Sequence, residues 1–440
     1  MGRDGARRGK VHWQRELETL PRRDLEALQL KRLKQTVAQV LRRTPFYQEK
    51  LKALGIRASD VQSSRDLRLL PFTTREDLRA TYPFGLLSVP REQATRLHTS
   101  SGTTGKPKAI FFSARDVDAA ATLMARCLVM SGATQADVLQ NMMTYGLFTG
   151  ALVMHYGAEK VGMLVIPAGP GNTERQIMLM QDFGTTAIHL TPSFALYLAD
   201  VLDKRGIDPR RDLSLRLAYV GAEPYTEQTR RKIEEALGVT VYNSYGLSEM
   251  NGPGVAFECV ARAGMHLWED HFLMEIVDPQ TGESLPDGEH GELVLTTLTR
   301  EAMPILRYRT RDITSIVKGR CPCGRTHRRI ERITGRSDDM FIVRGVNVYP
   351  QQIERVLMGM PALGRNYQIV LDGLDEMTVR VELSAQGFDG RVEHLLKLKQ
   401  EAAEALHAEI LLRPIVDVVP AGTLPVSEGK AQRVLDRRRL

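Results

Sequence analysis

The sequence predicts an α/β protein with a large N-terminal domain of parallel α/β sheets and an antiparallel β subdomain, followed by a small α+β domain. Between about residues 113 and 245, candidate strands alternate with candidate helices, which is the pattern of a parallel sheet covered by helices. From about 272 to 318, short strands are separated by turn signals such as Asp287-Gly288, which indicates antiparallel pairing. A chain of 440 residues also exceeds one ordinary core, so we expect domains at 1–334 and 335–440.

The elements of the N-terminal domain follow from apolar periodicity. Residues 1–60 are expected to be mainly helical, because leucines recur at helical spacing between Arg23 and Arg43. Ser113 can cap a helix that continues to about Met130. The expected elements after it are strands 137–139, 163–167, 186–190, 215–220 and 239–242, and helices 173–183, 193–204 and 227–237. Gly206 and Gly238 stand just past two of these helices, where glycine C-caps are favoured.

The segment after about residue 334 has its own pattern. Residues 379–383 alternate as a strand, 392–408 have helical periodicity, and 415–419 form another strand pattern. This mixture predicts a small α+β domain.

Composition and charge exclude several classes of protein. No apolar run approaches the roughly 20 residues of a membrane span, and residues 1–6 lack the apolar stretch of a signal peptide, so we expect a cytoplasmic protein. The net charge of +7 is modest. The sequence shows no basic patch with interleaved aromatic residues, so it does not predict nucleic-acid binding. The four cysteines are not expected to form disulfides in a reducing compartment.

The strongest functional signal is the loop Thr99-Ser100-Ser101-Gly102-Thr103-Thr104-Gly105-Lys106-Pro107-Lys108. Glycines let a backbone approach a phosphate closely, and hydroxyls and lysines can bind its oxygens. The spacing is not that of a Walker A loop, because only two residues separate Gly102 from Gly105. Strand patterns flank the loop on both sides. We interpret it as a phosphate-binding loop, and the alternative is a polar hairpin loop.

This loop resembles the phosphate-binding loop of the adenylate-forming superfamily, which includes acyl- and aryl-CoA synthetases, luciferases and nonribosomal adenylation domains. Further segments resemble other superfamily elements in the same order: Tyr245–Glu249, Tyr308–Asp312, Gly335–Asp339 with Arg344–Pro350, and Pro425–Lys430. Together they cover the chain from about residue 95 to its end.

The resemblance implies two half-reactions. A carboxylate attacks the α-phosphorus of ATP to give an acyl-adenylate and pyrophosphate, and coenzyme A then displaces AMP. It also implies that the C-terminal domain is a mobile lid that rotates about Asp338, with Arg344 and Gly345 lining a tunnel for the thiol. Lys430 would bridge the incoming carboxylate and the α-phosphate.

The resemblance assigns the remaining nucleotide contacts residue by residue. The loop residues Ser100, Ser101, Gly102, Thr103, Thr104, Gly105 and Lys106 would bind the β- and γ-phosphates. Ser248 would donate to the α-phosphate and Glu249 would hold Mg²⁺. Tyr245 would stack on adenine, and Asp312 and Arg336 would bind the ribose. Two strand ends, where ligands of parallel sheets bind, add Gly221, Ala222, Glu223, Pro224, Asn243, Ser244 and Gly246 to the ATP/AMP site.

Within the superfamily the chain resembles the phenylacetate–CoA ligase branch. The resemblance lies in Tyr145–Gly150, Gly252–Val255, Val343–Asn347 and Ser427–Lys430. It implies an aryl-acetate substrate such as phenylacetate, with Tyr145, Phe148, Ala222, Pro224 and Ser244 around the acid. Ser244 departs from the branch, in which a branched apolar residue is expected at this position. Its hydroxyl adds room and polarity, which favours a hydroxylated or bulkier aryl acid.

A possible metal site lies outside these motifs. Cys259, His266, Cys321 and Cys323 form a C-x6-H plus C-x-C set, and three thiolates with one imidazole suit a closed, structural Zn²⁺ site. His327 could replace His266, and Cys127 reads as a core thiol. The alternative is a group of buried unligated thiols with a surface histidine.

Two other functions are compatible with parts of the sequence. Coenzyme F390 synthetases resemble this branch but stop after nucleotidyl transfer and need no thiol tunnel. A zinc-containing nucleic-acid-binding protein is supported only by Cys321-Pro322-Cys323 and the arginines around it. We therefore expect small-molecule partners (an aryl acid, ATP and coenzyme A) and no nucleic acid or membrane. A homodimer is compatible with the sequence.

Overall fold

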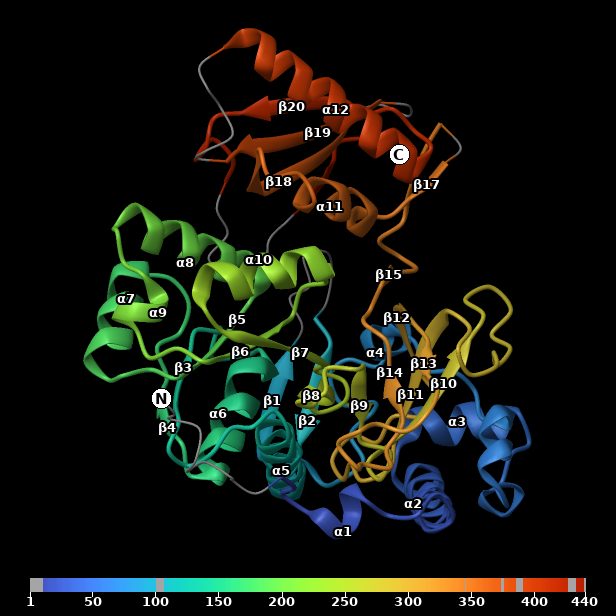
Figure 1. Ribbon diagram of the computed structural model, residues 1–440. Coiled ribbons are helices and arrows are strands. Elements are labelled where there is room, and N and C mark those ends of the chain that lie inside the picture. The colour runs from blue at the N-terminus through green and yellow to red at the C-terminus, as the bar shows by residue number, and fades with distance from the viewer. Residues whose placement is uncertain are drawn as a thin grey trace. The chain divides into compact units, whose positions relative to one another are not determined.

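The computed structural model describes residues 11–99, 107–344, 346–372, 376–384, 391–425 and 433–438, without the side chain of Asn347 (Figure 1). The chain divides into two compact units, each assembled from two segments. Unit 1 comprises residues 1–169 and 242–332, and unit 2 comprises 170–241 and 333–440. The division into domains at 1–334 and 335–440 stays a prediction. None of the described helices is long and apolar enough to cross a membrane.

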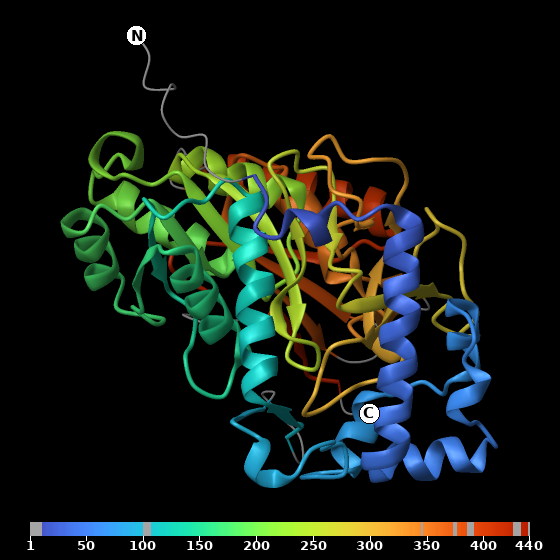
Figure 2. The ribbon, with the colours of Figure 1, turned by 90° about the horizontal axis from the view of Figure 1, so that it is seen from below.

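Helices form the N-terminal part of unit 1, as predicted. Their bounds are α1 (Arg15–Glu18), α2 (Arg22–Arg43), α3 (Pro45–Ala53), α4 (Arg75–Ala80), α5 (Ala114–Met130) and α6 (Thr149–Val161), with short 3-10 turns η1 (Ala58–Asp60), η2 (Ser64–Leu69) and η3 (Arg91–Gln93). Leu25, Leu33 and Val37 of α2 are fully buried, which confirms its predicted core face. Ser113 caps α5 by accepting from the backbone of Asp116. Seen from below, α1 lies between α2 and α5 (Figure 2).

Helix α6 was not predicted. Its stretch carries Gly150 and Gly157 and has no side-chain cap at Phe148, so local signals for a helix are weak. The helix is nevertheless stabilised by packing on α5. A Cβ atom at Gly157 would lie 2.4 Å from the Met124 side chain, so the missing side chain permits this close contact.

The strands of unit 1 form several sheets. Strands β1 (Arg96–Thr99) and β2 (Ala109–Phe112) pair antiparallel on either side of the predicted phosphate loop, and β3 (Val138–Asn141) and β4 (Leu164–Ile166) pair parallel. An antiparallel series contains β7 (Thr240–Leu247), β8 (Gly252–Glu258), β9 (Met265–Leu267), β14 (Arg329–Ile330) and β13 (Ile316–Val317). The predicted antiparallel subdomain is confirmed by β10 (Phe272–Val277), β11 (Gly291–Thr297) and β12 (Tyr308–Thr314).

The first segment of unit 2 has the expected alternation of strands and helices. Its elements are α7 (Thr173–Asp182), β5 (Ala187–Leu190), α8 (Pro192–Lys204), α9 (Pro209–Asp212), β6 (Leu217–Gly221) and α10 (Glu227–Leu237). Strands β5 and β6 pair parallel. Gly238 ends α10 with a φ of 66°, which confirms its predicted role as a C-cap.

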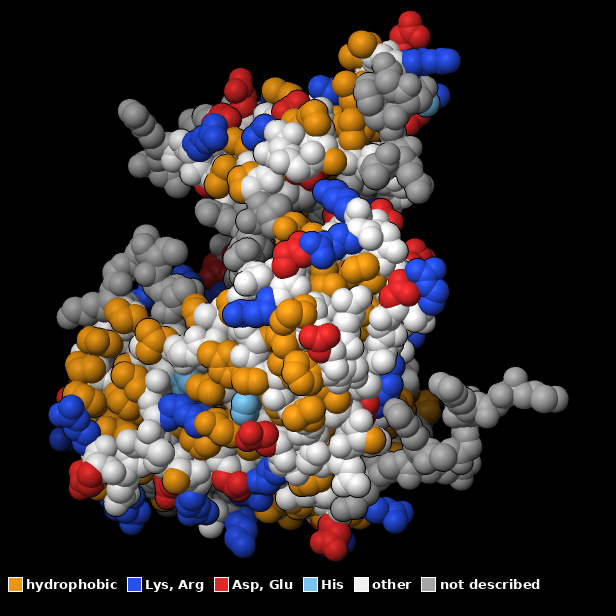
Figure 3. Space-filling view, turned by 90° about the vertical axis from the view of Figure 1, so that its left-hand side faces the viewer, with side chains coloured by type: hydrophobic (Ala, Val, Ile, Leu, Met, Phe, Trp, Pro, Cys, Tyr) orange, Lys and Arg blue, Asp and Glu red, His pale blue; other side chains and the backbone are white. Residues whose placement is uncertain are grey.

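The second segment of unit 2 is α+β, as predicted. Its elements are β15 (Gly335–Arg336), β16 (Phe341–Val343), β17 (Val346–Val348), α11 (Pro350–Met358), β18 (Leu363–Asp372), β19 (Glu376–Leu383), α12 (Val392–Ile410), β20 (Ile415–Val419) and β21 (Val434–Asp436). Strand β20 pairs with β19, β19 with β18, and β18 with β21. The core includes Ile353, Ile369, Val379 and Leu406. On the face seen in Figure 3, charged side chains are interspersed with apolar ones. Met178 on α7 and Phe183, which caps the C-terminus of α7, are both exposed.

Candidate active site

Two predicted motifs meet in unit 1. Tyr245, on β7, donates a hydrogen bond of 2.7 Å to Asp312 Oδ2 on β12. Tyr308, at the start of β12, donates at 2.9 Å to Glu249 Oε1. Both contacts are buried, so the segments that carry the predicted adenine, ribose and Mg²⁺ ligands are joined side chain to side chain.

Glu249 is a buried carboxylate with a cation beside it. It is 5% exposed, and the ammonium of Lys108 hydrogen-bonds to its Oε1. Burial alone would raise the pKa of Glu249, but the charge of Lys108 and the bonds from Lys108 and Tyr308 outweigh burial and lower the pKa. The ionised carboxylate is the oxygen ligand that Mg²⁺ prefers, so the residue suits its predicted role. Lys108 was not among the predicted site residues, although it is the last residue of the predicted phosphate-binding loop.

The N-terminus of α6 brings further side chains to this region. Thr149 Oγ1 lies 3.1 Å from Ser248 Oγ, so a helix that was not predicted contacts a predicted site residue. Just before α6, the Tyr145 hydroxyl accepts from Asn141 Nδ2 at 2.9 Å and lies 3.1 Å from His155 Nδ1. Burial raises the pKa of Tyr145 to about 12, so its hydroxyl stays protonated. Phe148 is 41% exposed in this structure.

Arg300 contacts two segments of the candidate site and was also not predicted as a site residue. Its guanidinium donates to Met250 O at 2.7 Å, directly after Glu249, and to the carbonyl of Phe111 on β2. It also stacks at 3.8 Å on the ring of Phe112. Arg300 is 3% exposed, and no motif surrounds it that would distinguish it in the sequence from any other arginine.

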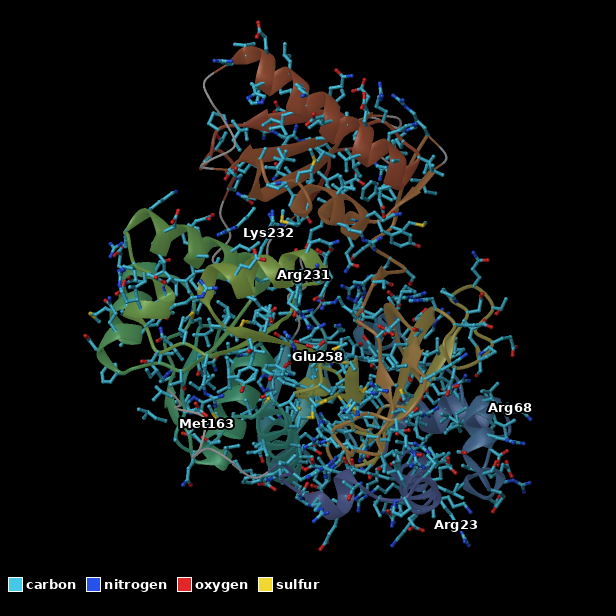
Figure 4. All side chains as sticks on the ribbon, viewed as in Figure 1. Arg23, Arg68, Met163, Arg231, Lys232 and Glu258 are labelled. Carbon is cyan, nitrogen blue, oxygen red and sulfur yellow. The ribbon has the colours of Figure 1, made fainter. Side chains whose placement is uncertain are left out.

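The remaining predicted residues on β7 have different environments. Asn243 donates its backbone N–H to Glu258 Oε2 at 2.8 Å, with Glu258 labelled on β8 in Figure 4. A Cβ atom at Gly246 would lie 1.9 Å from Gly252 O, so only glycine allows this close approach of the two strands. Ser244 is 7% exposed, and its Oγ has no hydrogen-bond partner among the described residues.

Other predicted residues belong to unit 2. Ala222, after Gly221 at the end of β6, has a φ of 68°, a strained value for a residue with a side chain. Glu223 accepts from the backbone N–H of Ser193 at 3.2 Å and from its hydroxyl at 2.9 Å. Pro224 lines a cavity of about 440 Å³ together with Glu223, Arg336 and Asp338.

The predicted ribose ligand and the predicted hinge residue contact each other. Arg336 Nε donates to Asp338 Oδ1 at 2.9 Å, and Asp339 lies 3.8 Å away. Arg344 is exposed with a φ of 50°. Some predicted site residues lie outside the described residues: Ser100, Ser101, Gly102, Thr103, Thr104, Gly105, Lys106, Gly345 and Lys430.

The four predicted zinc ligands come together in unit 1. Ligand atoms of Cys259, His266, Cys321 and Cys323 all lie within 4.8 Å of one another. Cys259 Sγ is 3.6 Å from Cys321 Sγ, and His266 Nε2 is 3.3 Å from Cys323 Sγ. His266 Nδ1 lies 3.0 Å from the carbonyl of His327, which orients the ring toward the thiols.

Two residues considered near this cluster have other contacts. His327 Nδ1 accepts from the backbone of Glu269 at 2.9 Å, and its Nε2 lies 3.0 Å from Leu17 O. Both ring nitrogens are therefore engaged, and His266 rather than His327 faces the thiols. Cys127 is fully buried under Trp268, whose Nε1 lies 3.4 Å from Sγ, as expected of a core thiol.

Comparison with known proteins identifies similar chains over nearly the full length. Residues 30–298 match the family model described as AMP-binding enzyme, and residues 345–438 match AMP-binding enzyme C-terminal domain. The chain is 50% identical to the phenylacetate–coenzyme A ligase of Thermus thermophilus, over 97% of this chain and 100% of that protein. It is 43% identical to that of Escherichia coli, over 96% and 97% of the two chains.

A solved structure is similar in fold. A crystal structure of 2-hydroxyisobutyryl-CoA ligase, in the postadenylation state with R3-HIB-AMP, aligns with a TM-score of 0.92 at 28% identity. The alignment covers 98% of this chain and 93% of the other.

Proposed function

Because the chain belongs to the phenylacetate–CoA ligase family of AMP-binding enzymes, we propose that it joins phenylacetate or a substituted analogue to coenzyme A. The enzyme is an AMP-forming acid–thiol ligase that works through an acyl-adenylate. The observation that carries this proposal is the meeting of the Tyr245–Glu249 and Tyr308–Asp312 segments in unit 1. These two buried hydrogen bonds support the proposal, because the carboxylates of Glu249 and Asp312 are each bonded to a tyrosine of the other segment.

The first half-reaction needs two anions held together and charge on phosphorus offset. Glu249 would hold Mg²⁺, which supplies positive charge to the ATP phosphates when bound. Ser248 would donate to the α-phosphate, with its hydroxyl oriented by Thr149. Asp312 would accept from the ribose hydroxyls, and Tyr245, held by Asp312, would stack on adenine. Lys430 would bridge the carboxylate and the α-phosphate.

The second half-reaction needs a thiol path to the adenylate. We propose that the segment from about residue 335 onward rotates about Asp338, so that Arg344 and Gly345 line that path. The hydrogen bond between Arg336 and Asp338 supports this role. If this bond breaks, Arg336 is released to bind ribose and the backbone at Asp338 is released to rotate.

Coupled assays test the proposed ligation. Pyrophosphate release and thioester formation should both depend on an aryl acid, ATP, Mg²⁺ and coenzyme A. Glu249→Gln should lower both activities, while Glu289→Gln, at an exposed position of the same unit, serves as the control. Pyrophosphate release in which the AMP moiety stays on an acceptor, with no thiol-dependent AMP release, would instead favour the nucleotidyl-transfer alternative. Absence of acid-dependent pyrophosphate release with any aryl acid would overturn the ligase proposal.

We also propose that Cys259, His266, Cys321 and Cys323 hold a structural Zn²⁺ ion. The donor set is the one found in closed tetrahedral zinc sites, and three of its four residues are buried. About one zinc per chain is expected by elemental analysis of protein purified without a metal-affinity tag. Cys321→Ser should lower the zinc content, and Cys127→Ser, the core thiol, should leave it unchanged. Zinc-free protein with unaltered melting after chelation would contradict the proposal.

A further inference from the structure

One buried guanidinium holds the backbone beside both partners of the Lys108–Glu249 pair. Arg300 donates through Nη1 to the carbonyl of Met250, directly after Glu249, at 2.7 Å. Through Nη2 it donates to the carbonyl of Phe111, on the strand β2 that begins directly after Lys108. The two residues of the pair are 141 positions apart in the chain, so their approach depends on tertiary contacts. Arg300 supplies such a contact to both segments at once.

Arg300 is itself fixed by the N-terminus of α5. Asp116 is 1% exposed and accepts from the backbone N–H groups of Glu301 at 2.7 Å and Ala302 at 2.9 Å. Its Oδ2 lies 4.0 Å from Arg300 Nε, so the buried guanidinium has a carboxylate beside it. The guanidinium also stacks at 3.8 Å on the ring of Phe112. Buried contacts therefore set both the chain at Arg300 and the place of its side chain.

A guanidinium suits these contacts better than an ammonium. Its donors form a rigid planar fork, which can bind two carbonyls while its face lies on an aromatic ring. The position of Glu249 matters because Mg²⁺ demands near-ideal octahedral geometry from its ligands. Residues that orient a metal ligand typically change metal affinity or activity by about 10–100-fold when they are replaced.

We propose that Arg300 is a positioning residue for the Mg²⁺ site. It acts through the backbone of Met250 and Phe111, and so keeps the Glu249 carboxylate where the metal binds in the first half-reaction. The second half-reaction has no triphosphate for the metal to bind, so it does not depend on Arg300. This inference rests on the proposed function, in which Glu249 holds Mg²⁺.

Binding of the ATP analogue α,β-methylene-ATP, measured by calorimetry with Mg²⁺ and with EDTA, tests the inference without turnover. The wild type should bind the analogue more tightly with Mg²⁺. Arg300→Met keeps an apolar stem but removes the fork, and should reduce this gain at least about tenfold. Arg300→Lys keeps the charge and should fall between the two. The ratio of two Kd values from one preparation does not depend on the fraction of protein that is folded.

The two half-reactions separate positioning from a general loss of structure. In both Arg300 variants, the Mg²⁺ concentration for half-maximal acid-dependent ATP–pyrophosphate exchange should rise. Thioester formation from preformed acyl-adenylate should keep its wild-type rate. Equal slowing of both half-reactions would show that Arg300 only stabilises unit 1, and would overturn the inference.

A second buried arginine provides the control. Arg329 is 5% exposed and donates to the carbonyls of Ala263 and Gly319, on segments that carry no predicted nucleotide ligand. Arg329→Met should leave the gain from Mg²⁺ unchanged. A gain that neither Arg300 variant alters would overturn the inference alone. Absence of acid-dependent pyrophosphate release with every aryl acid, in wild-type protein that binds the analogue, would instead overturn the proposed function.

Discussion

Tyr245 and Asp312 are joined by a buried hydrogen bond of 2.7 Å, although 67 positions separate them in the chain. Each belongs to a different motif, one expected on adenine and one on ribose. Because the phenol is held by the carboxylate, the position of the ring depends on Asp312. The two halves of the proposed nucleoside site are therefore coupled.

This coupling predicts the effect of Tyr245→Phe. The variant keeps the ring but removes its tether, so the KM for ATP should rise about tenfold, as expected for one bond to a charged acceptor. The KM for the acid should change little. Initial-rate measurements of AMP formation check this. Tyr47→Phe removes a buried hydroxyl that binds Thr73 and is the control. An unchanged KM for ATP in Tyr245→Phe would contradict the coupling.

The Lys108–Glu249 pair should matter strongly for stability. Both side chains are buried, so Lys108→Met leaves a carboxylate without a counter-charge and should destabilise unit 1 by about 3–5 kcal/mol. The double variant Lys108→Met/Glu249→Gln should recover part of this loss, because no buried charge remains. Urea unfolding followed by tryptophan fluorescence reports on unit 1, since Trp13 and Trp268 both lie there. A double variant less stable than Lys108→Met would exclude this explanation.

His189 gives a prediction for pH. It is buried on β5, and burial lowers its pKa to about 3, against 6.5 in an unfolded chain. Between these values the unfolded state binds a proton that the folded state does not, so stability falls as pH falls below about 6.5. The slope from this one group is about 1.4 kcal/mol per pH unit. His189→Gln should show a shallower loss between pH 6.5 and 5 by circular dichroism, whereas His290→Gln, at an exposed position, should behave as the wild type. Identical slopes in all three proteins would refute the assignment.

Much of the fold and of the site could be predicted from the sequence because the signals are local. The alternation of strands and helices in unit 2, the cap at Ser113 and the motif around Tyr245 each depend on residues close in sequence. The cysteine cluster was also predicted, since the chemistry of its ligands narrows the choice.

The missed features depend on contacts between distant segments. Helix α6 is stabilised by packing on α5 through Gly157, which a local pattern reads as a helix breaker. Lys108 acquires its role only from Glu249, which lies 141 positions away. Arg300 is recognised as a positioning residue only once Phe111 and Met250 are seen to share its guanidinium.

The loop after the cysteine cluster predicts an effect of metal removal. Arg325 Nε donates to Glu18 Oε2 at 2.8 Å, and the backbone N–H of Thr326 donates to Glu18 O at 3.2 Å. If zinc fixes Cys321 and Cys323, its removal should loosen this loop and release α1. Hydrogen exchange measured by mass spectrometry should then rise in residues 13–18 after chelation. Peptides from α12, in unit 2, should be unaffected, and unchanged exchange at residues 13–18 would show that the loop holds α1 without metal.

Glu354 connects the two segments of unit 2. On α11, its Oε1 accepts from Thr229 Oγ1 at 2.5 Å and from the backbone N–H of Thr226 at 3.2 Å, at the N-terminus of α10. Its Oε2 accepts from the Tyr367 hydroxyl at 3.0 Å. A carboxylate at a helix N-terminus is also stabilised by the helix dipole. These bonds cross the predicted domain boundary at 334–335, so a rotating lid must break them.

Glu354→Ala should therefore affect the two half-reactions unequally. The half-reaction that takes place with the Glu354 bonds intact should slow about tenfold, which corresponds to roughly 1.4 kcal/mol of lost hydrogen bonding. The other half-reaction should be unchanged or faster. Acid-dependent ATP–pyrophosphate exchange measures the first half-reaction, and thioester formation from preformed acyl-adenylate measures the second.

Arg365→Ala is the matched control. Its bond of 2.8 Å to Asp200 also links the two segments but is partly exposed, and exposed pairs contribute little. Lys232, labelled on α10 in Figure 4, has its pKa lowered by burial and then by Arg365, so losing that arginine removes a repulsion as well as a bond. Equal slowing of both half-reactions in Glu354→Ala would mean that Glu354 stabilises unit 2 without holding the lid.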